Sequence, residues 1–190
     1  MANGTLKVSN IQTSSGSGTI TIGASGETVD LSNGTMTLNS SMKNTPSFYA
    51  YLSANQDVTN GGFTKVTVDT EVFDSDGAYD NSTNYRFTPQ TAGKYFVFGS
   101  VELYAGGNSQ VQSCDPSIYK NGSRVIKGGE DYRTGYPRNS SPKVSGIVEC
   151  NGSSDYIELY IGNDITSGDA LAQGSSDQRT HFGAYRIVGA

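Results

Sequence analysis

Apolar residues recur at every second position in short segments from Phe48 to the end of the chain. In one segment Ile157, Leu159 and Ile161 fall on the same side of an extended strand. No helical period of 3.6 residues interrupts these segments, and turn residues separate them, so the pattern predicts an all-β sandwich or jelly roll. The predicted strands are Phe48–Leu52, Lys65–Phe73, Tyr85–Thr88, Tyr95–Tyr104, Pro116–Lys120, Arg124–Lys127, Lys143–Cys150, Tyr156–Ile161 and Thr180–Val188.

One turn has a specific chemical signature. Asn121 and Gly122 separate two apolar segments, and this dipeptide is typical of a tight two-residue β-hairpin. Both residues tolerate the positive φ angles that such a turn needs. We therefore expect the segments on either side to pair as antiparallel neighbours.

The first 45 residues differ from the remainder. They are polar and rich in Gly, Ser and Asn, with apolar pairs at period two, such as Leu6 with Val8 and Ile20 with Ile22. Strands this short bury too little surface to order by themselves. The pattern therefore favours a stalk or attachment segment at residues 1–45, in which several copies of the chain wind together, and a flexible linker is the alternative. Residues 46–190 form the predicted head.

Composition narrows the function classes. Hydrophobic residues are 34% and charged residues 16% of the 190 residues, and the 24 Gly and 12 Tyr suit a thin-cored β protein. The net charge of −5 disfavours nucleic acid as a partner. No apolar run is long enough to span a membrane, and the N-terminus lacks a signal peptide pattern, so we expect synthesis in a cytoplasm. Cys114 and Cys150 could form one bridge or remain two buried thiols.

Candidate catalytic and metal-binding residues are few. The only histidine is His181, at the start of a predicted strand, where a structural role is more common. Asp74, Asp76 and Asp80 lie close together but lack the spacing of a calcium loop, so turn formation is favoured. The pair Glu130 and Asp131 has the character of solvated loop charge. We therefore predict a non-enzymatic protein without a cofactor or metal.

Several motifs resemble the C1q-like domain of the complement and tumour necrosis factor superfamily. The resemblance covers residues 48–190, and its specific part consists of Gly77-Ala78-Tyr79-Asp80 followed by Gly93-Lys94-Tyr95-Phe96-Val97-Phe98. Further pieces are Lys120-Asn121-Gly122, the segment 144–161 and Phe182-Gly183-Ala184-Tyr185.

This resemblance implies a ten-strand jelly roll that assembles as a compact homotrimer, with both ends of the head at the side where the stalk attaches. On the strand 156–161, the side opposite the apolar residues is rich in tyrosine and suits burial against a partner. The predicted trimer-interface residues are Tyr95, Tyr156, Glu158, Tyr160 and Tyr185.

A long loop between predicted strands gathers Tyr and Arg, the residue types that anchor recognition surfaces. Its candidates for receptor contact are Tyr132, Arg133, Tyr136 and Arg138, and packing on a neighbouring subunit is an equal alternative. A second exposed loop extends from Asn163 to Arg179.

A polar N-terminal segment with a terminal jelly roll is similar in style to bacteriophage fibres and head appendages. The sequence therefore predicts a structural virion protein, released by lysis, whose residues 1–45 bind other virion proteins. Its head would contact a host cell-surface glycan or protein. A free carbohydrate-binding or glycan-cleaving β-sandwich module is the alternative, although the chain has no Trp to stack on sugars. A weaker alternative is an extracellular ligand of the tumour necrosis factor type.

Overall fold

The structure is a computed structural model that describes residues 42–189 and, before them, residues 11, 19, 21, 25, 26, 28, 37 and 38. The chain divides into two units, Met1–Thr37 and Leu38–Ala190, and the fold described below is that of the second. The segment predicted as a stalk, residues 1–45, lies almost entirely outside the described residues. The stalk and its boundary at residue 45 therefore stay predictions.

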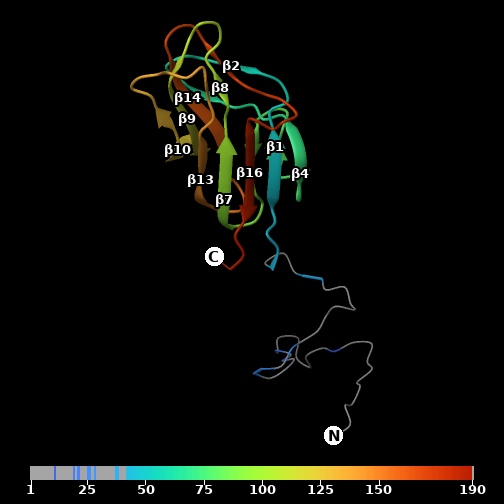
Figure 1. Ribbon diagram of the computed structural model, residues 1–190. Helices are drawn as coiled ribbons and strands as arrows, with labels where there is room; N and C mark the ends of the chain where they lie inside the picture. The colour runs from blue at the N-terminus through green and yellow to red at the C-terminus, as the bar shows by residue number, and fades with distance from the viewer. Residues whose placement is uncertain are drawn as a thin grey trace. The chain divides into compact units, whose positions relative to one another are not determined.

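The described residues form antiparallel sheets, and no helix among them is long and apolar enough to cross a membrane. The first sheet has five strands and includes both the first and the last strand of the unit (Figure 1). Its order is β13 (Lys143–Cys150), β7 (Gly93–Ser100), β16 (His181–Arg186), β1 (Ser47–Tyr51) and β4 (Thr70–Asp74).

The second sheet packs against the first and has seven strands, five of them along its main path. Its order is β10 (Ser123–Lys127), β9 (Val111–Lys120), β14 (Ile157–Ile165), β6 (Arg86–Phe87) and β5 (Tyr79–Asp80). Two short strands lie off this path: β11 (Glu130–Asp131) pairs with β9, and β3 (Phe63–Lys65) pairs with β14.

A third, four-stranded sheet lies at the end of the unit where β2 and β8 are seen in Figure 1. The start of β1 and the end of β16 lie at the opposite end, because these strands pair antiparallel with Ser47 opposite Tyr185. We call the end with the third sheet the distal end. The order of the third sheet is β12 (Asn139–Ser140), β8 (Leu103–Tyr104), β15 (Ala170–Ala172) and β2 (Gln56–Val58).

The core between the sheets is centred on aromatic rings. Phe48 stacks on Tyr79 with ring centroids 4.4 Å apart and on Phe87 at 4.7 Å, and Phe182 meets it edge-on at 5.0 Å. The Tyr79 hydroxyl donates to the carbonyl of Val68 at 2.8 Å, so its polar tip is satisfied inside the core. Burial raises the pKa of this phenol. Tyr79 belongs to the Gly-Ala-Tyr-Asp motif, which is therefore a packing motif.

The predicted hairpin is confirmed. Asn121 and Gly122 have φ angles of 52° and 76°, the left-handed conformation that a two-residue hairpin turn requires, and they connect β9 to β10. Asn121 also accepts a hydrogen bond from the backbone of Tyr156 at 3.0 Å. The turn thereby holds the start of β14 beside the hairpin.

Two predicted strands are interrupted. The segment Lys65–Phe73 was expected to be continuous, but β3 ends at Lys65 and β4 begins at Thr70. Val66 and Val68 fill the core between them with 1% and 0% of their surface exposed. The segment Tyr95–Tyr104 is likewise divided between β7 and β8. Alternating apolar residues predict which side of a strand is buried, but they do not show where the chain leaves one sheet and enters another. The pattern alone therefore could not predict these two interruptions.

Candidate interaction surfaces

The outward side of the five-stranded sheet is covered by aromatic and aliphatic side chains, and we call it the aromatic face. Strand pairing places Tyr49 opposite Gly183 and Gly183 opposite Phe98, and it places Tyr185 opposite Phe96. Because neighbouring residues across a ladder point to the same side, these side chains form rows across the sheet. The aromatic face comprises Tyr49, Tyr51, Phe73, Phe96, Phe98, Ile147, His181 and Tyr185.

The rings of the aromatic face contact one another. Tyr49 and Phe98 have centroids 6.1 Å apart, and Phe96 and Tyr185 have centroids 5.5 Å apart. The Phe98 ring lies directly over Gly183, where an added Cβ would come within 2.5 Å of its Cζ atom. Gly183 therefore lets the ring lie flat against the sheet and keeps the face even.

Three side chains of the aromatic face remain substantially exposed: Ile147 at 61%, Phe73 at 50% and Tyr185 at 42%. Single exposed apolar residues are common, but a contiguous exposed apolar patch marks an interaction surface. The row of cross-strand pairs makes this patch contiguous from β4 to β13. The aromatic face is therefore the strongest candidate for a protein interface among the described residues.

The prediction that Tyr95 lies at a subunit interface is wrong. Its side chain is 0% exposed, packs edge-on against Phe87 at 5.6 Å, and donates its hydroxyl to the Thr91 carbonyl at 2.6 Å. Burial raises its pKa to about 12. The outward residues of this strand are Phe96 and Phe98. Apolar residues occupy both sides of β7, so the sequence could not show which side faces the core.

The prediction for Glu158 is also wrong. The residue is 4% exposed, and its carboxylate lies 2.5 Å from the ammonium of Lys65 on β3. Glu158 points away from the core, but β3 covers it, and β3 was not foreseen as a separate strand beside β14. A strand that pairs across a long sequence separation leaves no local signal, which is why the burial was missed.

The remaining interface candidates do not share one surface. Tyr156 and Tyr160 lie on the sheet of β14, whereas Tyr185 lies on the opposite sheet and belongs to the aromatic face. Tyr160 stacks on Tyr119 at 4.0 Å, and the guanidinium of Arg86 lies 4.5 Å from the Tyr156 ring. Both tyrosines are half-buried by these contacts within the chain. Whether they also contact another subunit stays a prediction.

The tyrosine- and arginine-rich loop connects β11 to β12. Tyr132 is half-buried, and its hydroxyl donates to Glu130 and lies 3.1 Å from the Ser140 hydroxyl, so it anchors the loop. Arg138 donates to the Tyr104 hydroxyl at 2.6 Å. Arg133 is exposed and Tyr136 is half-buried. The loop is thus held to the distal sheet, and receptor contact by these residues stays a prediction.

The acidic residues considered for cation binding act instead in turns. The Asp74 carboxylate accepts the backbone N–H of Tyr79 at 2.8 Å. Asp80 accepts backbone N–H groups of Thr83 at 2.9 Å and Ser82 at 3.1 Å, and these bonds hold its pKa well below the usual range. Turn formation, the favoured interpretation, is confirmed. No cluster of three or more potential metal ligands occurs in the described part of the chain.

His181 lies within the aromatic face. Its ring centroid is 5.5 Å from that of Tyr49, and its Nδ1 lies 2.9 Å from the Gln178 carbonyl. An aromatic environment and a backbone partner give this histidine a packing role in the sheet surface.

Cys114 and Cys150 are both free and buried, which settles the question of a bridge. Burial raises the pKa of the Cys114 thiol to about 12 and that of Cys150 to about 11. Cys150 lines a cavity of about 260 Å³ beside Lys120 and Asp155, whose charged groups pair at 2.9 Å. Glu149 also lines this cavity, so its carboxylates outnumber its one ammonium group. The raised pKa values hold both thiols in the unreactive neutral form at neutral pH.

Comparisons with known proteins find matches in structure alone. No protein-family model and no curated protein matches the sequence. The structure is similar to Eiger TNF from S. frugiperda, with a TM-score of 0.53 and 8% identity over 76% of this chain and 93% of that one. It is also similar to murine APRIL at pH 8.0, with a TM-score of 0.53 and 12% identity over 74% of this chain and 98% of that one. A structure of murine APRIL at pH 5.0 has a TM-score of 0.51 at 12% identity, over 74% of this chain and 99% of that one.

The fold is a TNF-like jelly roll. The expected all-β jelly-roll class is thereby confirmed for the described residues, while the trimer and the stalk stay predictions. At identities of 8% and 12% the likeness concerns the fold alone, because this fold carries many functions. Within the TNF-like jelly roll, the sheet that joins β1 to β16 carries the aromatic face.

Proposed function

We propose that this protein is a non-enzymatic structural protein that assembles as a homotrimer through the aromatic face. The TNF-like jelly roll is then the head of a bacteriophage virion fibre, or of an appendage on the capsid or tail, and it serves in attachment to the host surface. Residues 1–45 join the head to other virion proteins. The aromatic face is the single observation that carries the proposal of assembly.

Further copies of the same chain are the occupant that best suits this face. Its centre, where the Phe98 ring lies over Gly183, offers shape and apolar area but no charge that would select a different partner. Charged residues lie at its margin. On β13, Glu149 is the cross-strand partner of Lys94, and Lys143 at the other end of the strand is the partner of Ser100. An apolar centre with a polar rim is typical of stable interfaces. Closed rings of identical subunits cover such a face on every copy, and the C1q-like resemblance favours three.

The proposal of a virion role rests on the sequence of the N-terminal segment. Its apolar pairs recur between polar turns, a pattern that needs partners to bury the apolar side chains. A trimeric head would bring three such segments together. The distal loops would then face away from the attachment end and could contact a host glycan or protein. They adjoin β12 and β15, which belong to the sheet of β2 and β8, and Figure 1 shows β2 and β8 at the end opposite the start of β1.

Assembly is tested by the solution mass of the full chain, measured by light scattering after size exclusion at micromolar concentration. We expect about 60 kDa, three times the chain mass of 20.1 kDa. The variants Ile147→Asp and Tyr185→Asp place a charge on exposed positions of the aromatic face, and we expect each to lower the mass toward that of one chain. Val125→Asp is the matched control, because Val125 is 49% exposed on β10 of the other sheet.

A mass of 20.1 kDa for the unaltered chain would overturn the homotrimer. If Val125→Asp dissociates the assembly and Ile147→Asp does not, the interface lies on the other sheet. The virion role is tested separately, by labelling purified phage particles with antibodies raised against residues 46–190. Particles that carry the protein at stoichiometric amounts support the role, and particles without it refute it.

A further inference from the structure

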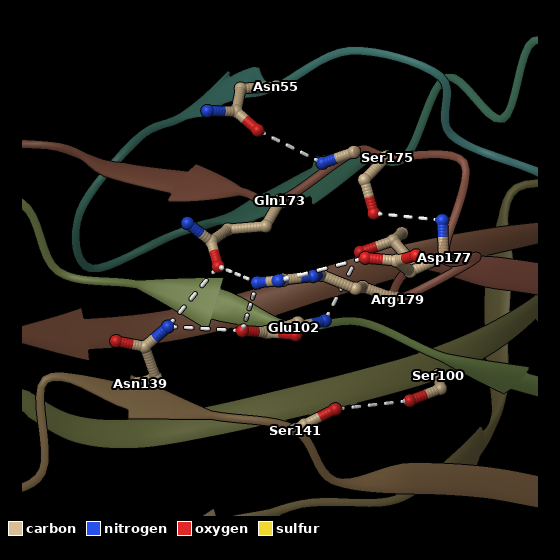
Figure 2. Close-up of polar contacts among 11 residues, drawn as sticks. Asn55, Ser100, Glu102, Asn139, Ser141, Gln173, Ser175, Asp177 and Arg179 are labelled. Carbon is tan, nitrogen blue, oxygen red and sulfur yellow. Dashed lines mark hydrogen bonds and ion pairs between the residues drawn. The ribbon is translucent and has the colours of Figure 1, made fainter.

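Four polar side chains meet at the distal end, where the two loops singled out from the sequence come together (Figure 2). We call them the distal ring. Each comes from a different element: Glu102 lies between β7 and β8, Asn139 begins β12, Gln173 follows β15 and Arg179 precedes β16. The ring therefore exists only in the folded chain.

In the distal ring, two donor groups each bind the same two acceptor oxygens. The Asn139 Nδ2 atom donates to Glu102 Oε1 at 3.1 Å and to Gln173 Oε1 at 3.2 Å. The Arg179 Nη1 atom donates to the same two oxygens, at 3.3 Å each. Turning either amide would bring a nitrogen to a nitrogen or an oxygen to an oxygen, so the network determines which amide atoms point outward.

The backbone holds these side chains in place. Gln173 donates its N–H to the Glu102 carbonyl at 2.8 Å, and Glu102 donates its N–H to the Thr180 hydroxyl at 3.1 Å. Asn139 pairs with Tyr104 in the distal sheet. The arrangement is thus formed before any ligand arrives, which lowers the entropy cost of binding.

The second polar atom of each amide, the acceptor Asn139 Oδ1 and the donor group Gln173 Nε2, has no hydrogen-bond partner among the described residues. In Figure 2 both point to the side of the ring away from Arg179. A fixed acceptor beside a fixed donor matches two neighbouring hydroxyl groups of a sugar, because one hydroxyl donates while the next accepts. A hydroxyl pair bound in this way gives Asn139 Oδ1 a donor and Gln173 Nε2 an acceptor.

The charge of the site selects a neutral ligand. The carboxylate of Glu102 is balanced by Arg179, and the exposed carboxylate of Asp177 lies 3.9 Å from the other nitrogen of the same guanidinium. Two carboxylates around one guanidinium leave a small negative excess. A sugar with its own carboxylate would be repelled.

We propose that the distal ring binds a neutral saccharide through a pair of neighbouring hydroxyl groups. Asn139 Oδ1 accepts from one hydroxyl, and Gln173 Nε2 donates to the next. The inference rests on the proposed attachment function for its biological role, since it names the class of host molecule that the head recognises. The site itself is complete within one chain.

The test is a titration of the ¹⁵N-labelled full chain followed by two-dimensional NMR, with the side-chain amide signals of Asn139 and Gln173 as the readout. The probes are methyl α-D-mannopyranoside, methyl β-D-glucopyranoside and methyl β-D-galactopyranoside, each added to about 50 mM because a small polar site binds in the millimolar range. We expect saturable shifts of both amide signals with at least one probe. The methyl glycoside of N-acetylneuraminic acid, which carries a carboxylate, should leave them unchanged.

The variant Gln173→Glu keeps the shape of the side chain but replaces the outward donor by an acceptor, and we expect it to weaken binding about tenfold or more. Gln110→Glu is the matched control, because Gln110 is exposed and its side chain takes no part in the ring. The proposal is overturned if none of the three probes shifts the two amides, if shifts occur only elsewhere, or if the acidic sugar binds equally well. Unchanged binding by Gln173→Glu would also overturn it.

The same samples separate this proposal from that of trimer assembly. Binding by a chain with a mass of 20.1 kDa would leave the saccharide site standing and remove the homotrimer. A trimer that fails to bind any probe would remove the saccharide site alone.

Discussion

The ion pair of Lys65 and Glu158 tests whether Glu158, which the sequence pattern predicts at a subunit interface, is buried within the chain. The two charged groups are 2.5 Å apart, and the Glu158 side chain is 5% exposed against 32% for Lys65. Replacing Lys65 by methionine keeps much of the apolar stem but leaves the carboxylate buried without its partner. Breaking a buried pair in this way costs about 3–5 kcal/mol, and the partial exposure of Lys65 places the expected cost at about 3 kcal/mol.

The expected consequence is measured by thermal and urea unfolding at a fixed protein concentration, since assembly makes the midpoint depend on concentration. For a chain of this size, about 3 kcal/mol corresponds to a fall in Tm of about 6–12 °C. The double variant Lys65→Met with Glu158→Leu removes both charges, and we expect it to recover most of the loss. Lys127→Met is the control, because its pair with Asp115 is more exposed and about 1 kcal/mol or less is at stake.

The reasoning would be refuted if Lys65→Met and Lys127→Met lowered stability equally. Equal effects would mean that Glu158 is solvated in solution and that β3 does not cover it. A double variant no more stable than Lys65→Met would point instead to lost packing by the lysine stem. The first outcome would overturn the burial of Glu158, and the second would overturn the lost ion pair as the cause of the destabilisation.

Two further predictions follow from groups with shifted pKa values. Hydrogen bonds from Asn121 and from Lys120 lower the pKa of Asp155 to about 2, below the unfolded value of about 3.9, so this stabilisation is present above about pH 4 and is lost as the pH falls toward 2. Thermal unfolding from pH 5 to pH 2 should therefore show a shallower pH dependence in Asp155→Asn than in the unaltered chain, and identical slopes would contradict the assignment. Because burial raises the thiol pKa values of Cys114 and Cys150 to about 12 and about 11, we expect no rapid reaction with a disulfide reagent at pH 8 in the native state and reaction of both in denaturant. A fast native reaction would show that one of the thiols is accessible.

Turns and the strand class could be predicted from the sequence, because they depend on a residue and its near neighbours along the chain. Asn121 and Gly122 form the expected hairpin because their backbone preferences decide the turn without help from the rest of the chain. Asp80 binds the backbone of the next residues for the same reason. The all-β class follows from the period of two and the scarcity of apolar residues, both of which are properties of the chain itself.

The sequence alone could not decide which side of a doubly apolar strand faces the core. Tyr95 and Phe96 are equivalent in pattern, yet the first is buried and the second lies on the aromatic face. The choice depends on which sheet packs against β7, a contact between residues far apart in the chain. The same holds for Glu158, whose burial depends on β3.

The sequence by itself therefore determined the strand class, the hairpin, the turn aspartates and the polar character of residues 1–45, because each depends on a residue and its near neighbours. Only the tertiary structure decided the aromatic face and the distal ring. The face requires the register that brings Phe98 over Gly183, and the ring requires loops that end at Asn139 and at Arg179 to meet at Glu102. Pairing across long separations is selected by the energy of the whole fold and leaves no mark within any one segment.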